Sequence, residues 1–108
     1  MPLSIPASQV KTIYFACEAG MGSSLMSASW LIKRLSAAHI NINIIPKPVA
    51  EVPADAQVVL VHKGLVRVIR LKAPNAVILT FDHFLTDPVF NKLIEALVED
   101  REIVSTEP

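Results

Sequence analysis

One stretch of this sequence places a thiol among glycines and hydroxyls. Cys17 is followed by Gly20 and Gly22 and by the adjacent serines Ser23 and Ser24. Glycine lets the backbone fold tightly around a tetrahedral anion, because it tolerates positive φ and carries no side chain. Serine hydroxyls can donate further hydrogen bonds to such an anion. These residue types suit a nucleophilic thiolate that attacks phosphorus and then holds the charged product.

This thiol would be positioned by a strand before it and a helix after it. Thr12–Ala16 is a short apolar run typical of a buried strand, and Ser24–Ala38 has helical periodicity. The unpaired N–H groups and the dipole at a helix start attract anions and favour a thiolate over a thiol. Spacing alone leaves two interpretations about equally open. Cys17 is either a reactive thiol or a core residue beside an ordinary turn.

Strands and helices alternate along the rest of the chain. Strands are expected at His39–Ile45, Gln57–Val61 and Ala76–Thr80, and helices at Leu65–Leu71 and from Pro88 onward. Such alternation predicts an α/β fold with a mostly parallel sheet and helices on its faces.

Two features refine this pattern. Isoleucines alternate with asparagines in His39–Ile45, which indicates an edge strand, and three prolines predict a loop after it: Pro46, Pro48 and Pro53. Apolar residues at helical spacing predict the buried face of the first helix, namely Leu25, Ala28, Ile32 and Leu35. In the second helix we expect Leu65, Val68 and Ile69 on one side.

Length and composition fit one small domain. Of the 108 residues, we expect 1–10 to be a loose lead-in, 11–98 to form the domain, and 99–108 to be a charged, frayed tail. Ten basic residues balance ten acidic ones, so nucleic-acid binding is not expected. The single cysteine indicates a reducing compartment. We see no signal peptide and no apolar stretch near the roughly 20 residues of a spanning helix, and so expect a cytoplasmic protein without membrane insertion.

The ten residues from Cys17 to Met26 closely resemble the phosphocysteine loop of mannitol-type enzyme IIB domains of the bacterial phosphotransferase system (PTS). There the motif runs cysteine, an acidic residue, Ala-Gly-Met-Gly-Ser-Ser, a small residue and methionine. The resemblance extends over roughly residues 11–98. It implies a three-layer α/β sandwich with a four-stranded parallel sheet in the order 2-1-3-4, similar to low-molecular-weight tyrosine phosphatase. It also implies that no metal or other cofactor is used.

The resemblance further implies that Cys17 is the phosphorylated residue of a IIB subunit. The phosphoryl group would come from a phosphohistidine on a IIA partner and pass to a sugar or hexitol, mannitol-like, bound by a membrane-embedded IIC partner. The phosphate cradle would comprise the residues after the cysteine: Glu18, Ala19, Gly20, Met21, Gly22, Ser23 and Ser24. Glu18 stands where Asp is more usual, and Lys63-Gly64 stands where close mannitol relatives have Arg-Asp. This second departure leaves the substrate undecided.

Four further residues are candidates for supporting roles. His62 and Lys63 follow a predicted strand, so they could help to neutralise the phosphate, or they could be ordinary loop residues. Met26 and Trp30 lie on the face of the first helix away from Ile32, beside cationic residues. They could form a docking surface for IIA or IIC. Equally, Trp30 could pack against a neighbouring helix.

Two alternatives to sugar phosphotransfer stay open. Low-molecular-weight tyrosine phosphatases and related arsenate reductases also hold a thiolate in a phosphate loop, but their C-x5-R motif has an arginine where this chain has Ser23. Asp87-Pro88 resembles the acid of such phosphatases, although it also suits the start of a helix. The second alternative is a phosphorelay subunit without a transport role.

Overall fold

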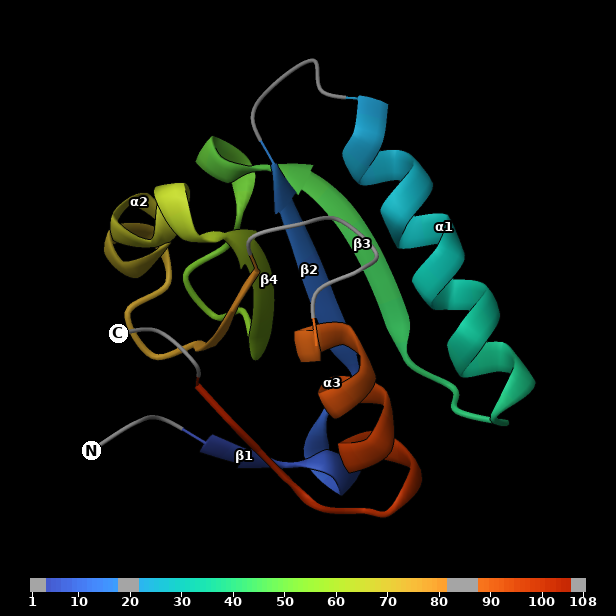
Figure 1. The fold of residues 1–108 in the computed structure, drawn as a ribbon. Helices are drawn as coiled ribbons and strands as arrows, with labels where there is room; N and C mark the ends of the chain where they lie inside the picture. The colour runs from blue at the N-terminus through green and yellow to red at the C-terminus, as the bar shows by residue number, and fades with distance from the viewer. Residues whose placement is uncertain (1–3, 18–21, 82–87, 106–108) are drawn as a thin grey trace.

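The computed structural model describes the backbone of residues 4–17, 22–81 and 88–105, and the side chains of 4–16, 29–81 and 88–105. Its main sheet has four parallel strands in the spatial order β3 (Asn43–Pro48), β2 (Thr12–Cys17), β4 (Val58–His62) and β5 (Val77–Phe81) (Figure 1). Counted along the chain, this is the predicted order 2-1-3-4. The described α-helices are α1 (Gly22–Ala37), α2 (Val66–Lys72) and α3 (Pro88–Val98). The α/β fold class is therefore confirmed.

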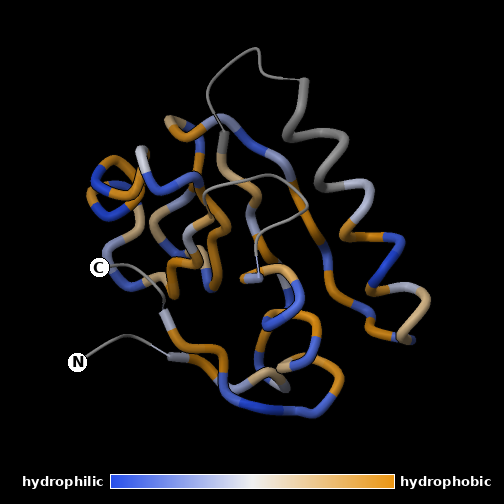
Figure 2. Tube along the Cα trace, in the orientation of Figure 1, coloured by the Kyte–Doolittle hydropathy of each residue, from blue (hydrophilic) through white to orange (hydrophobic). Residues whose placement is uncertain are grey.

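Two apolar cores make the molecule a three-layer sandwich. Helices α1 and α3 pack on one face of the sheet, through residues such as Leu31, Leu35 and Phe90. Helix α2 packs on the other face through Ile69, together with the short 3-10 helix η2 (Val49–Glu51). Figure 2 shows apolar segments gathered where these layers meet. Strand β4 lies between both cores, and its four consecutive residues Val58–Val61 are fully buried. That burial explains their uninterrupted apolar run.

The edge strand β3 differs from the sequence prediction. It begins at Asn43 rather than His39, and it includes Pro46 and Pro48, which were expected in a loop. The N–H of Asn43 donates to the carbonyl of Lys11 (3.1 Å), so odd-numbered residues of β3 direct their amides toward β2. The amide nitrogens of both prolines therefore face the open edge, where no hydrogen bond is needed.

The buried face of α1 also differs from the prediction. Ile32 was expected to be buried, but 44% of it is exposed, while Leu31 and Leu35 are buried. Leu31 and Leu35 are four residues apart and share one helix face, so they are enough to anchor α1 on the sheet. In α2 the same kind of error concerns Val68, which is 41% exposed, whereas Ile69 is completely buried.

The chain ends pair with each other in a second, two-stranded sheet that the sequence did not predict. β1 (Ser4–Pro6) is antiparallel to β6 (Glu102–Val104), and Ile103 is 3% exposed. The hydroxyl of Ser105 donates to the carbonyl of Ile78 (3.0 Å), which ties the end of the chain to β5. The segments expected to be a loose lead-in (1–10) and a frayed tail (99–108) thus each contain a short strand. Neither has the alternating apolar pattern that would have identified it.

Candidate functional site

The predicted nucleophile lies at the carboxyl edge of the main sheet. Cys17 is the last residue of β2 and pairs with Pro48 of β3, and α1 begins five positions later at Gly22. Ser23, Ser24 and Met26 fall in the first turns of α1. The side chains of these residues lie outside the described part of the chain. Residues 18–21, which include Glu18, Ala19, Gly20 and Met21, lie outside it entirely, as does Asp87.

His62 ends the neighbouring strand at the same edge. The last printed pair between β2 and β4 is Phe15 with Leu60. Two residues farther along these parallel strands are Cys17 and His62, the last residue of each strand. Lys63 follows directly in the short 3-10 helix η3 (Lys63–Leu65) and is exposed. The structure thus brings these strand ends to one edge, as expected, whereas contact of His62 or Lys63 with phosphate stays a prediction.

The ring of His62 is held by two neighbours. The N–H of Gly64 donates to its Nδ1 (3.1 Å), which makes His62 the N-cap of η3. Because Nδ1 accepts this bond, a neutral His62 carries its proton on Nε2. The imidazole also meets Phe81, the last residue of β5, edge-on at 5.8 Å between ring centroids. This arrangement gives the carboxyl edge a hydrogen-bond donor of defined tautomer.

Aromatic rings beneath this edge form a continuous cluster that sequence reasoning missed. Phe81 contacts Phe15 and Phe90, with centroids 5.6 and 5.4 Å apart. Trp30 of α1 meets Phe90 of α3 edge-on at 5.9 Å. The cluster extends from His62 at the end of β4 to Trp30 of α1, and it includes Phe15 of β2. The available signal was the position of Phe15, two residues before Cys17 and on the face of β2 that carries the α1–α3 core.

Trp30 itself is half-buried and packs against the core that α1 and α3 share. The guanidinium of Arg34 lies 5.1 Å from the centre of its ring. The interpretation that Trp30 packs against a neighbouring helix is therefore confirmed. Docking of a partner on Met26 and Trp30 stays a prediction.

Basic residues outnumber acidic ones in the stretch of sequence from β4 to β5. No acidic residue occurs between Ala56 and Phe81, whereas four basic residues do: Lys63, Arg67, Arg70 and Lys72. Lys47 lies opposite Ala16 in the pairing of β3 with β2 and is half-buried. Sequence reasoning overlooked Lys47, because the prolines on either side suggested a loop rather than a strand. Lys63 and Lys47 follow or lie near the ends of β4 and β3, where positive charge would favour an anionic ligand.

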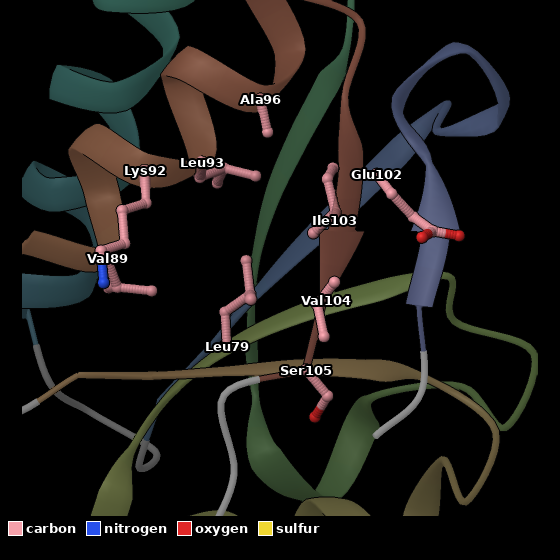
Figure 3. Close-up of a pocket in the computed structure, with 9 residues that line it drawn as sticks. All are labelled: Leu79, Val89, Lys92, Leu93, Ala96, Glu102, Ile103, Val104 and Ser105. Atoms are coloured by element: carbon pink, nitrogen blue, oxygen red, sulfur yellow. The ribbon is translucent and has the colours of Figure 1, made fainter. Parts of the chain in front are cut away.

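Other kinds of site receive no support in the described ranges. Among residues 4–17, 22–81 and 88–105, no group of three His, Cys, Asp or Glu side chains could hold a metal ion. No helix of those ranges is long and apolar enough to cross a membrane. A cavity of about 310 Å³ is present, but it lies between α3, β5 and β6, where it is lined mainly by aliphatic residues such as Leu79, Leu93 and Ile103 (Figure 3). It does not include the strand ends at Cys17 and His62.

Known proteins resemble this chain over most of its length. The family described as PTS system, Lactose/Cellobiose specific IIB subunit matches residues 12–96. The PTS system mannitol-specific EIICB component of Bacillus subtilis (strain 168) is 41% identical over 88 residues, which cover 82% of this chain and 18% of that protein. The EIICB component of Geobacillus stearothermophilus is 41% identical over 93 residues, 86% of this chain and 20% of that protein.

A third relative is named as an EIICBA component rather than an EIICB component. The PTS system mannitol-specific EIICBA component of Buchnera aphidicola is 35% identical over 94 residues, which cover 86% of this chain and 15% of that protein. This chain therefore spans a fifth or less of the length of these three relatives.

Proposed function

Since the chain belongs to the IIB family of the phosphotransferase system, we propose that Cys17 carries a phosphoryl group between two partner proteins. The group arrives from a phosphohistidine on a IIA protein. It leaves to a sugar or hexitol bound by a membrane IIC protein. In this role the chain is the IIB subunit of a protein-phosphohistidine–sugar phosphotransferase in the cytoplasm, and it needs no metal or other cofactor.

The observation that carries this proposal is the position of Cys17 between a strand end and a helix start. β2 ends at Cys17, and α1 starts at Gly22. The first four N–H groups of an α-helix have no partner within the helix, and its dipole is positive at that end. A phosphoryl group on Cys17 would therefore lie near donors that suit a dianion, supplied by the segment from Glu18 to Ser24.

The first transfer exchanges a phosphorus–nitrogen bond for a phosphorus–sulfur bond. The Cys17 thiolate attacks phosphorus in line with the histidine nitrogen of IIA, which departs with the bonding electron pair and takes up a proton. The three equatorial oxygens gain charge in this step, so backbone N–H groups and the hydroxyls of Ser23 and Ser24 would stabilise them. No water is required, and the arrangement works best when the docked IIA protein excludes it.

The second transfer returns the thiolate. A hydroxyl of the bound sugar attacks phosphorus and loses its proton, the phosphorus–sulfur bond breaks, and Cys17 leaves as a thiolate ready for the next cycle. A mannitol-like hexitol is our proposed substrate, because the three relatives named above are mannitol-specific PTS components. Sugar selectivity would lie in IIC, which is where the sugar binds.

His62 and Lys63 are proposed to assist at the same edge. The Nε2–H of His62 could donate to a phosphoryl oxygen, because its Nδ1 is already occupied by Gly64. Lys63 adds a positive charge directly beside it. Ser23, in place of the phosphatase arginine, favours a carrier over a phosphatase, because the bidentate phosphate contact of that arginine is missing.

Reconstitution of the whole pathway tests this function. The chain is mixed with phosphoenolpyruvate, the general PTS proteins, a mannitol IIA protein and membranes that contain a mannitol IIC protein, and mannitol phosphate is measured. We expect product to depend on the chain and to disappear with Cys17→Ser. The variant Lys11→Ala, at the opposite edge of the sheet, serves as the control and should support normal transfer.

Two results would contradict the proposal. One is phosphorylation of Cys17 without any product on mannitol or on other hexitols, which would favour the phosphorelay. The other is steady hydrolysis of p-nitrophenyl phosphate that depends on Cys17, which would favour a phosphatase.

A further inference from the structure

Helix α2 presents an outer face that the fold leaves uncovered. It is anchored to the sheet by Ile69, which is completely buried. Its opposite face carries Leu71, which is 85% exposed, and Val68, which is 41% exposed. These aliphatic side chains are three residues apart and therefore adjacent on the helix surface. Isolated apolar residues are common on protein surfaces, so the residues that border this pair matter for what it could bind.

The aliphatic pair is bordered by cations. Arg67 is four residues before Leu71, and Lys72 is four residues after Val68, so each cation lies beside one of the two aliphatic side chains. Both cations are exposed. We call Arg67, Val68, Leu71 and Lys72 the α2 face. Figure 1 shows α2 on the opposite side of the sheet from α1 and α3, and Figure 2 shows apolar and hydrophilic residues interleaved along it.

We propose that the α2 face binds the surface of a membrane that contains anionic lipids. The aliphatic pair would enter the headgroup region, and Arg67 and Lys72 would approach lipid phosphates. The whole chain has a formal net charge of +0, so general attraction to an anionic surface is not expected. Attraction would come from this segment, because residues 57–81 contain four basic residues and no acidic one.

A lipid surface suits this face better than a protein partner. Protein interfaces are usually anchored by buried aromatic residues that fill pockets, and α2 contains no aromatic residue. Interfacial segments place Lys and Arg beside an apolar face, and α2 combines two exposed cations with two exposed aliphatic side chains. The inference rests on the proposed function in one respect. A IIC partner would hold the chain near the membrane and so add to the binding that this face shows by itself.

Flotation with lipid vesicles tests the proposal on the whole chain. Vesicles contain phosphatidylglycerol and phosphatidylcholine in equal parts, and vesicles of phosphatidylcholine alone serve as the neutral comparison. We expect binding only to the anionic vesicles, with a loss as salt is raised. The double variant R67A/K72A should weaken binding roughly tenfold or more. Leu71→Ser should weaken it several-fold, as expected for one lost aliphatic anchor.

Matched variants elsewhere on the surface control for charge and hydropathy. Lys11→Ala with Lys92→Ala removes two exposed cations, and Val98→Ser removes an exposed aliphatic residue, all outside α2. These should bind vesicles like the unmodified chain. Equal binding to neutral and anionic vesicles, or equal losses in the control pair and R67A/K72A, would overturn the proposal.

The rate of phosphoryl transfer from IIA tests the lipid proposal and the proposed function independently. Without membranes, the α2 variants should accept phosphoryl from IIA at the normal rate, because the α2 face does not include Cys17. Variants that bind vesicles normally but accept phosphoryl slowly would show that the face belongs to a protein partner, and would overturn the lipid assignment. Normal phosphorylation without vesicle binding by the unmodified chain would overturn this inference and leave the proposed function standing.

Discussion

Among single residues at the carboxyl edge of the sheet, His62 is held by both a hydrogen bond and a ring contact. Its Nδ1 accepts the Gly64 N–H, and its ring packs on Phe81. His62→Ala should lower the free energy of unfolding by about 1 kcal/mol, because it removes the acceptor that caps η3. His62→Asn should recover much of this loss, since an asparagine oxygen can cap the same N–H. Urea unfolding followed by circular dichroism measures both.

This prediction assumes that His62 stabilises the fold mainly through its hydrogen bond to the Gly64 N–H, and not through the contact of its ring with Phe81. If His62→Asn were as destabilising as His62→Ala, the packing of the ring on Phe81 would be the main contribution. The control is Lys63→Ala, which leaves the His62 cap in place.

At this scale the sequence was most informative where a local motif was present. Cys17 at a strand end and His62 at the neighbouring strand end follow from apolar runs that stop at these residues. The contacts of Phe81 with Phe15 and Phe90 could not be predicted, because they join residues far apart in the chain. Lys47 was missed because two prolines suggested a loop, and only pairing with β2 makes that segment a strand.

Among the elements, helix α1 contributes to stability through the residues that it packs against the core, and Trp30 is one of them. Trp30→Ala should lower the free energy of unfolding by about 1–3 kcal/mol, because a half-buried ring that contacts Phe90 is lost. Trp30→Phe should retain most of the stability. Urea unfolding followed by circular dichroism checks this, and Lys33→Ala, which is exposed on the same helix, serves as the control.

The Trp30 variants also distinguish a packing role of Trp30 from a role in docking a partner. A Trp30→Ala protein of unchanged stability that accepts phosphoryl slowly from IIA would contradict the packing account and favour a docking role. The sequence could not decide between them, because Leu31 and Ile32 are equally apolar and neighbouring in sequence. Only the position of α1 on the sheet determines which one is buried.

Helices α1 and α3 are both followed by a residue in the left-handed region. His39 has φ 61° and Asp100 has φ 55°, both in the left-handed region. In each case the next residue closes the helix: the Ile40 N–H donates to the Leu35 carbonyl (2.9 Å), and the Arg101 N–H donates to the Ala96 carbonyl (2.8 Å). These are Schellman caps with a residue other than glycine in the left-handed position.

Glycine should therefore stabilise the end of α1. His39→Gly should raise the free energy of unfolding by about 0.5–1 kcal/mol, because the left-handed penalty of roughly 1–2 kcal/mol is partly offset by the greater flexibility of glycine when unfolded. Thermal and urea unfolding measure the gain. His39→Ala keeps the penalty and should show no gain. A destabilising His39→Gly would mean that the imidazole makes a stabilising contact of its own.

For the whole molecule, the residue pattern predicted the parallel sheet and one edge strand, and the family resemblance implied the full strand order, whereas the pairing of the chain ends could not be predicted. Buried strands that alternate with helices indicated the parallel sheet, and the alternation of isoleucine with asparagine in His39–Ile45 indicated that the strand there lies at an edge. β1 and β6 have three residues each and pair across nearly the full length of the chain. Segments so short carry no periodic signal, so their pairing depends on the completed fold.

Shortening the chain tests how much its two end segments contribute to the free energy of unfolding. We propose that residues 11–98 form the family domain but need the ends for full stability, because Ala7, Val10 and Ile103 belong to the α1–α3 core. A chain of residues 11–98 should lose about 3 kcal/mol or more of unfolding free energy. A chain of residues 4–105, which keeps both strands, is the control and should unfold like the full chain. Equal stability of all three would contradict the inference.

The role of Cys17 is tested by locating the phosphoryl group on the chain after transfer from IIA. The chain is phosphorylated by phosphoenolpyruvate, the general PTS proteins and IIA, then digested and sequenced by mass spectrometry at neutral pH. We expect a phosphoryl group on the sulfur of Cys17, lost on iodine treatment and absent from Cys17→Ser. A phosphoryl group on His62 or His39, with Cys17 unmodified, would contradict this expectation.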